Sequence, residues 1–170
     1  MSASLLVRSA RSPADLDGTR KLFREYEAWL GYDLCFQGFE AELAALPGRY
    51  APPAGRLLLA EVAGALVGCV ALREFGPGIA EMKRLYVRDA ARGAGAGRAL
   101  ADRVVADARA IGYSAMRLDT LRLPKMAAAN RLYERMGFRD IPPYYPNPLP
   151  EARYMELALG ASAGAEIRRP

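Results

Sequence analysis

The 170-residue sequence predicts a single α/β domain built on a mixed sheet, and three observations lead to this fold class. Segments with helical periodicity and segments rich in β-branched and aromatic residues follow one another along the chain, separated by turns rich in Gly and Pro. The composition, 52% hydrophobic and 25% charged, is ordinary for a globular protein with a sizeable core. A glycine-rich loop at residues 92–97 joins a strand-like segment to a helix-like segment.

The first part of the chain contains a short strand-like segment and two helix-like segments. Ser12 followed by Pro13 is typical of a helix start, with the serine as N-cap. Pro47-Gly48 ends the second helix, and the following residues to Gly55 favour a loop. The expected elements are a strand over Leu5–Arg8, a helix from Pro13 to Gly31 and a helix over Phe36–Leu46.

Three consecutive strands come next, and we expect them to be antiparallel. Leu57–Ala63 and Ala65–Phe75 flank a turn near Ala63-Gly64, which is the pattern of a β-hairpin. Gly76-Pro77-Gly78 forms a second turn and leads into a strand over Ile79–Val87.

The second part of the chain alternates helices and strands around its glycines. Gly112 and Gly137 are suited to end the two helices. Ile141–Pro150 holds five prolines in ten residues and cannot be a regular element. The expected elements are a helix from Arg98 to Ile111, a strand over Met116–Leu121, a helix over Pro124–Met136, and strands over Phe138–Ile141 and Tyr154–Leu159. We therefore expect one domain over residues 1–159 and a flexible tail over 160–170.

The glycine-rich loop has the properties of a phosphate-binding site. Glycines let the backbone approach an anion closely, and the first turn of the next helix offers unpaired N–H groups and a favourable dipole. The loop lacks the Gly-Lys-Ser/Thr ending of a Walker A motif, and the third glycine of a Rossmann fingerprint is missing. The predicted phosphate-binding residues are Arg92, Gly93, Ala94, Gly95, Ala96, Gly97 and Arg98.

Two motifs resemble the signatures of the GNAT N-acetyltransferase superfamily. Arg92-x-x-Gly95-x-Gly97 is similar to the family's acyl-CoA loop, Gln/Arg-x-x-Gly-x-Gly/Ala. The run from Asn130 through Tyr133 to Gly137-Phe138 is similar to its second signature, Asn/Ala-x-x-Leu-Tyr-x-x-x-Gly-Phe. The resemblance covers roughly residues 5–159 and implies a central twisted sheet of six to seven strands flanked by about four helices.

The resemblance also implies acetyl-CoA as co-substrate and a set of contacts to it. The loop would hold the pyrophosphate, and Asn130 would bond the pantetheine–pyrophosphate arm. The main chain of Leu85, Tyr86 and Val87 would bind the thioester carbonyl and pantetheine. The hydroxyl of Tyr133 would lie near the sulfur as a general acid. Taken without the resemblance, Tyr133 would be an ordinary core residue of an amphipathic helix.

Glu81 is the candidate general base. Attack on a thioester requires a neutral amine, so a proton acceptor is needed, and the chain has no histidine. Several GNAT enzymes place a glutamate at this offset, eleven positions before the loop arginine (92 − 81). The alternative is that Glu81 pairs with Lys83 or Arg84 as a structural charge. Strict period-2 alternation places Glu81, Lys83, Leu85 and Val87 on one face of the strand, and Met82, Arg84 and Tyr86 on the other.

These observations together predict an acetyl-CoA-dependent N-acetyltransferase that moves the acetyl group to a primary amine by direct attack in a ternary complex. A non-catalytic acyl-CoA-binding module and a nucleotide-binding protein are the alternatives. The acceptor is not readable: an antibiotic amine, a polyamine, an amino acid, a peptide N-terminus and a protein lysine all stay open. The proline-rich segment at 142–148 and the loop Gly31–Asp33 could wall the acceptor pocket.

Bulk properties limit the other partners. The net charge is +5, but the basic residues are scattered, so a nucleic-acid partner is not expected. Cys35 and Cys69 are far apart and suggest neither a metal site nor a disulfide, and no metal is expected. We find no signal peptide and no membrane-spanning segment, which indicates a cytoplasmic protein. The resemblance leaves a homodimer open.

Overall fold

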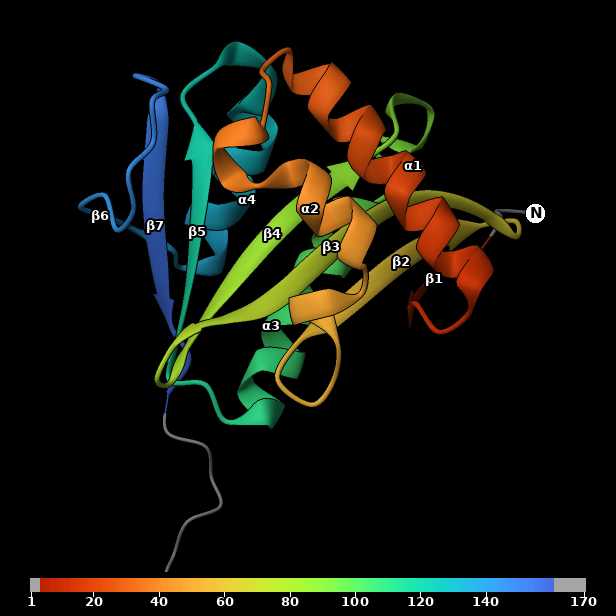
Figure 1. The fold of residues 1–170 in the computed structure, drawn as a ribbon, viewed down its shortest axis with the longest axis horizontal. Coiled ribbons are helices and arrows are strands. Elements are labelled where there is room, and N and C mark those ends of the chain that lie inside the picture. The colour runs from red at the N-terminus through yellow and green to blue at the C-terminus, as the bar shows by residue number, and fades with distance from the viewer. Residues whose placement is uncertain (1–3, 161–170) are drawn as a thin grey trace, which may run out of the picture.

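The computed structural model describes residues 4–160, which form one seven-stranded sheet with helices on both faces (Figure 1). The tail expected at 160–170 lies, apart from Gly160, outside the described residues. The elements are β1 (Leu5–Ser9), α1 (Pro13–Leu30), α2 (Phe39–Ala45), β2 (Arg56–Val62), β3 (Ala65–Gly76), β4 (Ile79–Val87), α3 (Ala96–Ile111), β5 (Ala115–Leu121), α4 (Ala127–Met136), β6 (Arg139–Ile141) and β7 (Ala152–Ala158).

The sheet has the order β1-β2-β3-β4-β5-β7-β6, and only β4 and β5 pair in parallel. The antiparallel β2–β3–β4 meander confirms the expected strands. Helices α1 and α2 cover the face nearer the viewer in Figure 1, and α3 covers the opposite face. Each face therefore has its own hydrophobic core, and the sheet separates the two cores.

Local chemistry explains most element boundaries. Ser12 caps α1 with a reciprocal capping box to Asp15, as the sequence led us to expect for the cap. The hairpin between β2 and β3 turns at Ala63 and Gly64, both with positive φ (52° and 77°).

Three predicted helix boundaries were wrong, each by a turn or less. The helix expected over Phe36–Leu46 is a 3₁₀ turn at Cys35–Gln37 followed by α2, because Gly38 between them is left-handed with φ 70°. Helix α3 begins at Ala96 rather than at Arg98, with Gly95 as N-cap. The helix expected from Pro124 opens as a 3₁₀ turn over Pro124–Met126 and becomes α-helical at Ala127.

A bulge in β4 changes which side chains share a face. Between two neighbouring register pairs, β3 advances two residues (Ala71 to Cys69) while β4 advances three (Lys83 to Tyr86). Arg84 lies in this bulge with φ 60°, a left-handed conformation that costs a non-glycine residue on the order of 1 kcal/mol or more. The strict alternation expected for β4 is therefore wrong.

The two faces of β4 are thus composed differently from the expected ones. Glu81 and Lys83 share the α2 face with Tyr86, whereas Leu85 and Val87 pack with Met82 in the core under α3. The bulge therefore brings Arg84 onto the same side as Lys83, where both side chains bond to Gln37.

A glycine of β3 is required beside this bulge. A Cβ added to Gly68 would lie 2.7 Å from the carbonyl oxygen of Tyr86 and 3.2 Å from the side chain of Leu100. We expect Gly68→Ala to lower the free energy of unfolding by about 1–3 kcal/mol, because backbone atoms cannot move aside cheaply. Gly76→Ala in the same strand is the control, since nothing lies within 4 Å of its added Cβ. Equal unfolding free energies for the two variants in denaturant titrations would contradict the prediction.

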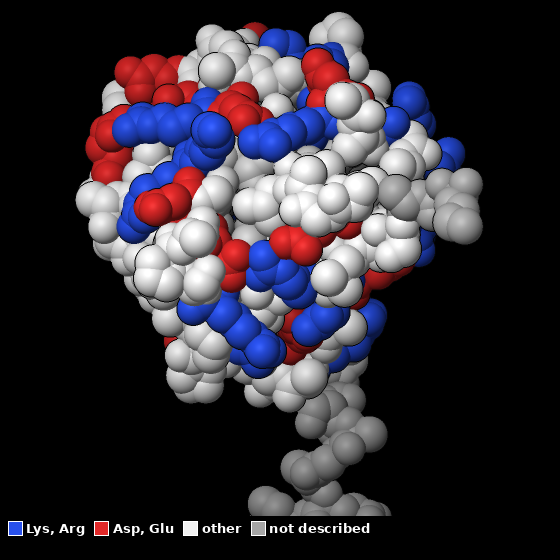
Figure 2. Space-filling view, turned by 90° about the vertical axis from the view of Figure 1, so that its right-hand side faces the viewer, with Lys and Arg blue, Asp and Glu red and all other residues white. Residues whose placement is uncertain are grey.

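Charged side chains of both signs are interspersed over the face that carries the start of α1 and the β2–β3 turn (Figure 2). Many of them are paired across elements, as in the contact of Arg8 with both Asp15 and Glu61. Within residues 4–160, no helix has the length and apolar character needed to cross a bilayer.

Candidate active site

The glycine-rich loop leads into α3, and the first backbone N–H groups of this helix have no hydrogen-bond acceptor among the described residues. Gly93 and Gly95 are left-handed, with φ 85° and 82°, and Gly95 caps the helix without a side-chain hydrogen bond. The N–H groups of Ala96, Gly97 and Arg98 make no hydrogen bond to the described part of the chain. These donors and the positive end of the helix dipole point out of the same end, which is the arrangement that favours an anion.

The two arginines of the loop already have partners. Arg92 pairs with Asp89 at 2.6 Å, and its guanidinium lies 4.5 Å from the ring centroid of Trp29. Arg98 pairs with Asp102 at 2.9 Å and is exposed. Either arginine would have to exchange an exposed carboxylate for a phosphate, a change that costs little at the surface.

Strands β4 and β5 separate next to this loop. They pair only from Ile79–Glu81 with Ala115–Arg117, and beyond that point they diverge (Figure 1). A cavity fills the gap, lined on one side by Met82 to Leu85 and on the other by Leu118 to Leu121. The cavity itself is narrow, with a volume of about 40 Å³.

The free edge of β4 presents a backbone donor to this gap. Gly68 and Val87 face each other as a non-hydrogen-bonded pair, because the next N–H, that of Arg88, bonds to the Val67 carbonyl at 2.8 Å. The N–H and C=O of Val87 therefore point away from β3. The carbonyl accepts a hydrogen bond from Nε of Arg92 at 3.1 Å, and the N–H faces the gap.

Of the three β4 residues expected to contact a cofactor, Leu85 lines the cavity. The ring of Tyr86 turns to the other face, 6.0 Å from the ring of Tyr26 and 6.3 Å from that of Trp29. Any contact from Tyr86 or Val87 to a ligand in the gap would be made by the main chain, as expected.

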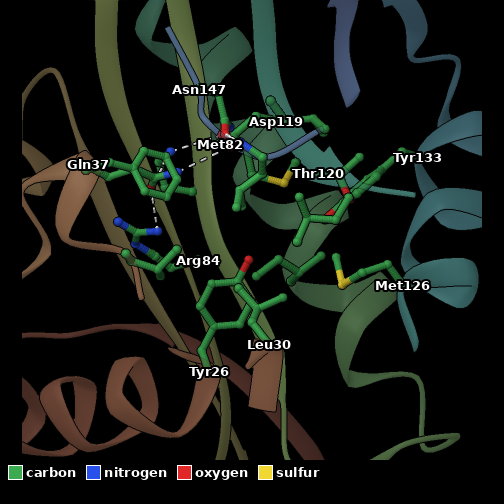
Figure 3. Close-up of a pocket in the computed structure, with 17 residues that line it drawn as sticks. Tyr26, Leu30, Gln37, Met82, Arg84, Asp119, Thr120, Met126, Tyr133 and Asn147 are labelled. Atoms are coloured by element: carbon green, nitrogen blue, oxygen red, sulfur yellow. Dashed lines mark hydrogen bonds and ion pairs between the residues drawn. The ribbon is translucent and has the colours of Figure 1, made fainter. Parts of the chain in front are cut away.

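Two phenols approach the cavity from different elements (Figure 3). Tyr133 comes from α4 and Tyr26 from α1. Burial raises the pKa of Tyr26 to about 12 and raises that of Tyr133 still further. Neither hydroxyl bonds to a described residue. Both phenols therefore keep their proton at neutral pH, and each hydroxyl is available as a hydrogen-bond donor.

Asn130 joins α4 to the end of β5. Its amide nitrogen donates to the carbonyl of Leu121 at 3.0 Å, and its amide oxygen accepts from the hydroxyl of Thr120 at 2.8 Å. Asn130 thus holds the helix that carries Tyr133 against the strand that lines the cavity. Its predicted contact to the cofactor arm would have to coexist with these two bonds.

Glu81 is fully buried, 1% exposed, and its partner is neither Lys83 nor Arg84. One carboxylate oxygen accepts from Nε of Arg73 on β3 at 2.8 Å and forms an ion pair with Nη2 of the same side chain at 2.7 Å. The other accepts from the hydroxyl of Tyr144 at 2.7 Å. Glu81 lines a second cavity beside the first. Arg73, Lys83 and Arg84 also line this second cavity.

A polar cluster that the sequence did not reveal lies where the two cavities meet. Asp119 on β5 accepts from Lys83 at 3.0 Å, from Tyr145 at 2.7 Å and from Gln37 at 3.4 Å. Burial alone would raise the pKa of Asp119, but the Lys83 ammonium and the Tyr145 hydroxyl outweigh it and hold the pKa below its usual value. Asn147 donates to the Tyr145 hydroxyl at 3.0 Å and lines the cavity.

Of the two segments expected to wall the acceptor pocket, only one contributes residues to the cavities. Tyr145 and Asn147 of the proline-rich segment line the cavities, whereas Gly31–Asp33 do not line them, although the flanking Leu30 and Leu34 do. Three members of the polar cluster come from a 3₁₀ turn (Gln37), a strand (Asp119) and an irregular segment (Tyr145), so no spacing in the sequence connects them.

Residues 53–140 match the model of the acetyltransferase (GNAT) domain. The chain belongs to the GNAT acetyltransferase family. It is 41% identical over 159 residues to an uncharacterised N-acetyltransferase of Schizosaccharomyces pombe, covering 92% of this chain and 96% of that protein. It is 39% identical over 155 residues to an IAA acetyltransferase of Azospirillum brasilense, covering 90% and 98%.

Solved structures show the same fold. A GNAT acetyltransferase from Staphylococcus aureus superposes with a TM-score of 0.76 at 18% identity, over 92% of this chain and all of the other. A putative acetyltransferase from Salmonella typhimurium, solved with acetyl-CoA, gives 0.69 at 21% identity, over 96% and 98%. Membership of the GNAT family makes the protein an acetyl-CoA-dependent N-acetyltransferase.

Proposed function

We propose that the protein transfers the acetyl group of acetyl-CoA directly to a primary amine within a ternary complex. The observation that carries this proposal is the arrangement of three features around one gap: open N–H donors at the start of α3, the free edge of β4, and the protonated hydroxyl of Tyr133. Together they fit an acyl donor with a diphosphate at one end and a thioester at the other.

Each group has a defined task. Acetyl-CoA supplies the acetyl group as a thioester. The N–H groups of Ala96, Gly97 and Arg98 bind its pyrophosphate, and the N–H of Val87 is available to the thioester carbonyl. Arg92, Gly93, Ala94 and Gly95 shape the loop. Tyr133 protonates the departing thiolate as the C–S bond breaks and the C–N bond forms.

Glu81 is our candidate for accepting the proton that the attacking amine loses. Both of its oxygens are engaged, with Arg73 and Tyr144, so transfer through a water molecule suits the geometry better than direct contact. Its position on the wall of the second cavity supports this role, because we assign that cavity to the acceptor.

A covalent acetyl-enzyme has no support from the cysteines. Cys69 is fully buried, its thiol bonds to the carbonyl of Arg84 at 3.4 Å, and burial raises its pKa strongly. Cys35 is exposed, lines neither cavity, and has a pKa raised by its hydrogen bond to Asp33.

Initial-velocity kinetics test the proposal. Acetyl-CoA and an amine acceptor are varied together, and release of the CoA thiol is followed. Direct transfer gives intersecting double-reciprocal lines, and no acetyl group stays on the protein after incubation with acetyl-CoA alone. Parallel lines together with a mass increase of one acetyl group would overturn it.

A further inference from the structure

We propose that the acetyl acceptor is a small aminocarboxylate, a molecule that carries a carboxylate as well as the reacting amine. This inference rests on the proposed function and assigns the second cavity as the acceptor pocket. The cavity, called here the charged chamber, is lined by three cations (Arg73, Lys83, Arg84), two acids (Glu42, Glu81) and the rings of Phe36, Phe75 and Tyr145.

The charged chamber adjoins the cavity between β4 and β5. Phe36, Gln37, Lys83 and Arg84 line both of them. The chamber therefore lies next to the gap where Tyr133 lies, which is the place an acceptor must reach. The chamber has a cavity volume of about 160 Å³, well above the ~10–15 Å³ that one water molecule needs, so a small molecule has room in it.

The acids around the chamber have their oxygens occupied. Both oxygens of Glu42 accept from Arg84, at 3.0 and 3.1 Å. Those of Glu81 accept from Arg73 and Tyr144. Those of Asp119, next to the chamber, accept from Lys83 and from Tyr145. Each of these acids is thus already paired with a cation of the protein, which leaves little net negative charge to attract a second cationic group of an acceptor.

Two of the cations, by contrast, keep unused donors. Lys83 is 6% exposed and bonds only to Asp119 and Gln37, so one of its three N–H donors is unused among the described residues. Arg73 donates to one oxygen of Glu81 through Nε and forms an ion pair with it through Nη2, and its Nη1 has no acceptor in residues 4–160. The spare capacity of the chamber is therefore cationic and donating.

These two donors are placed to act on the same group. Arg73 faces Glu81 in the β3–β4 register, and Lys83 lies two residues further along the same face of β4. Such diagonal neighbours are roughly 7–8 Å apart at their Cα atoms, so their long side chains can reach one carboxylate. Guanidinium and ammonium groups bind a carboxylate through charge-assisted hydrogen bonds. A polyamine, in contrast, would bring further positive charge to buried cations.

Matched acceptors test the inference. Amino acids with aliphatic and aromatic side chains are compared with their carboxamides and with the corresponding decarboxylated amines, together with polyamines and peptide N-termini. We expect the carboxylates to exceed their carboxamides in kcat/KM by about tenfold or more. Equal or faster turnover of the carboxamides, amines or polyamines would overturn the inference while leaving the acetyltransferase function intact.

Arg73 variants connect the preference to the chamber. Arg73→Gln should remove most of the preference for carboxylates over carboxamides. Arg73→Lys keeps a cation beside Glu81 and should retain part of that preference, so it serves as the test if the glutamine variant does not fold. Arg56→Gln is the control: Arg56 forms an ion pair with Asp107, its side chain is 25% exposed against 24% for Arg73, and it lines neither cavity. A preference unchanged in both Arg73 variants would contradict the assignment.

Binding separates the two proposals if no acceptor in the panel reacts. The protein loaded with CoA is titrated calorimetrically with the amino acids and their carboxamides. Tighter binding of the carboxylates supports the chamber assignment, and equal or absent binding of both overturns it. Failure to bind acetyl-CoA at all would instead count against the proposed function.

Discussion

Replacing Tyr133 with Phe should lower kcat by about 10²-fold or more and leave the affinity for acetyl-CoA nearly unchanged. The hydroxyl makes no hydrogen bond to a described residue, and the ring packs against Phe138 with 5.8 Å between centroids. Phenylalanine can keep that packing, so only the proton donor is lost. Steady-state kinetics and a thermal unfolding curve on the same preparation check both parts.

Tyr26→Phe is the matched control for this experiment. Tyr26 lines the same cavity, its hydroxyl has no described partner either, and burial raises its pKa to about 12. We expect a change in kcat of only a few-fold. If the two variants lost activity equally, Tyr133 would have no distinct role as acid.

The pH dependence gives an independent check on Tyr133. Because burial raises its pKa above that of Tyr26, the phenol stays protonated throughout the range in which an amine substrate titrates. In the wild type we expect no alkaline loss of kcat up to about pH 10, the usual pKa of an unperturbed tyrosine. A fall in kcat well below that pH would exclude Tyr133 as the proton donor.

Replacing Gly95 with Asp should weaken acetyl-CoA binding by about tenfold or more relative to Gly95→Asn. Both residues tolerate left-handed backbone better than other side chains, and nothing lies within 4 Å of a Cβ added at this position. The two variants therefore differ mainly in one negative charge at the start of α3, where the pyrophosphate is proposed to bind.

Stability and affinity should move in opposite directions in this pair. An aspartate at the N-cap interacts favourably with the helix dipole, so Gly95→Asp should be at least as stable as Gly95→Asn. Calorimetric titration should show its weaker binding, with the difference shrinking in high salt. Equal affinities for acetyl-CoA at low salt would show that the pyrophosphate lies elsewhere.

The sequence predicted the phosphate loop and the order of the elements because both depend on local signals. Glycines at Gly93 and Gly95 indicate left-handed backbone directly, and Gly112 and Gly137 end helices where expected. The predicted helix boundaries were wrong where the same residue is compatible with two local conformations. Gly38 interrupts a segment whose hydrophobic pattern is helical throughout, and Pro124 begins a 3₁₀ turn as readily as an α-helix.

The acceptor side could not be predicted, because its geometry depends on register and on a bulge without a sequence signal. Arg84 occupies a left-handed position where glycine would have been the recognisable residue. Glu81 meets Arg73 only because β3 and β4 pair in one register, and adjacent charges along the chain suggested different partners. Gln37 and Asp119 are 82 residues apart in sequence and meet only in the folded protein.

The contact between the phosphate loop and Trp29 has a practical consequence. Trp29 is the only tryptophan of the chain, and the guanidinium of Arg92 lies over its ring, with the Lys125 ammonium 5.7 Å from the same ring centroid. Tryptophan fluorescence of this protein therefore comes from Trp29 alone, directly beside the proposed pyrophosphate site. The protein carries its own optical reporter, which can follow occupancy of the loop without a label or an acceptor.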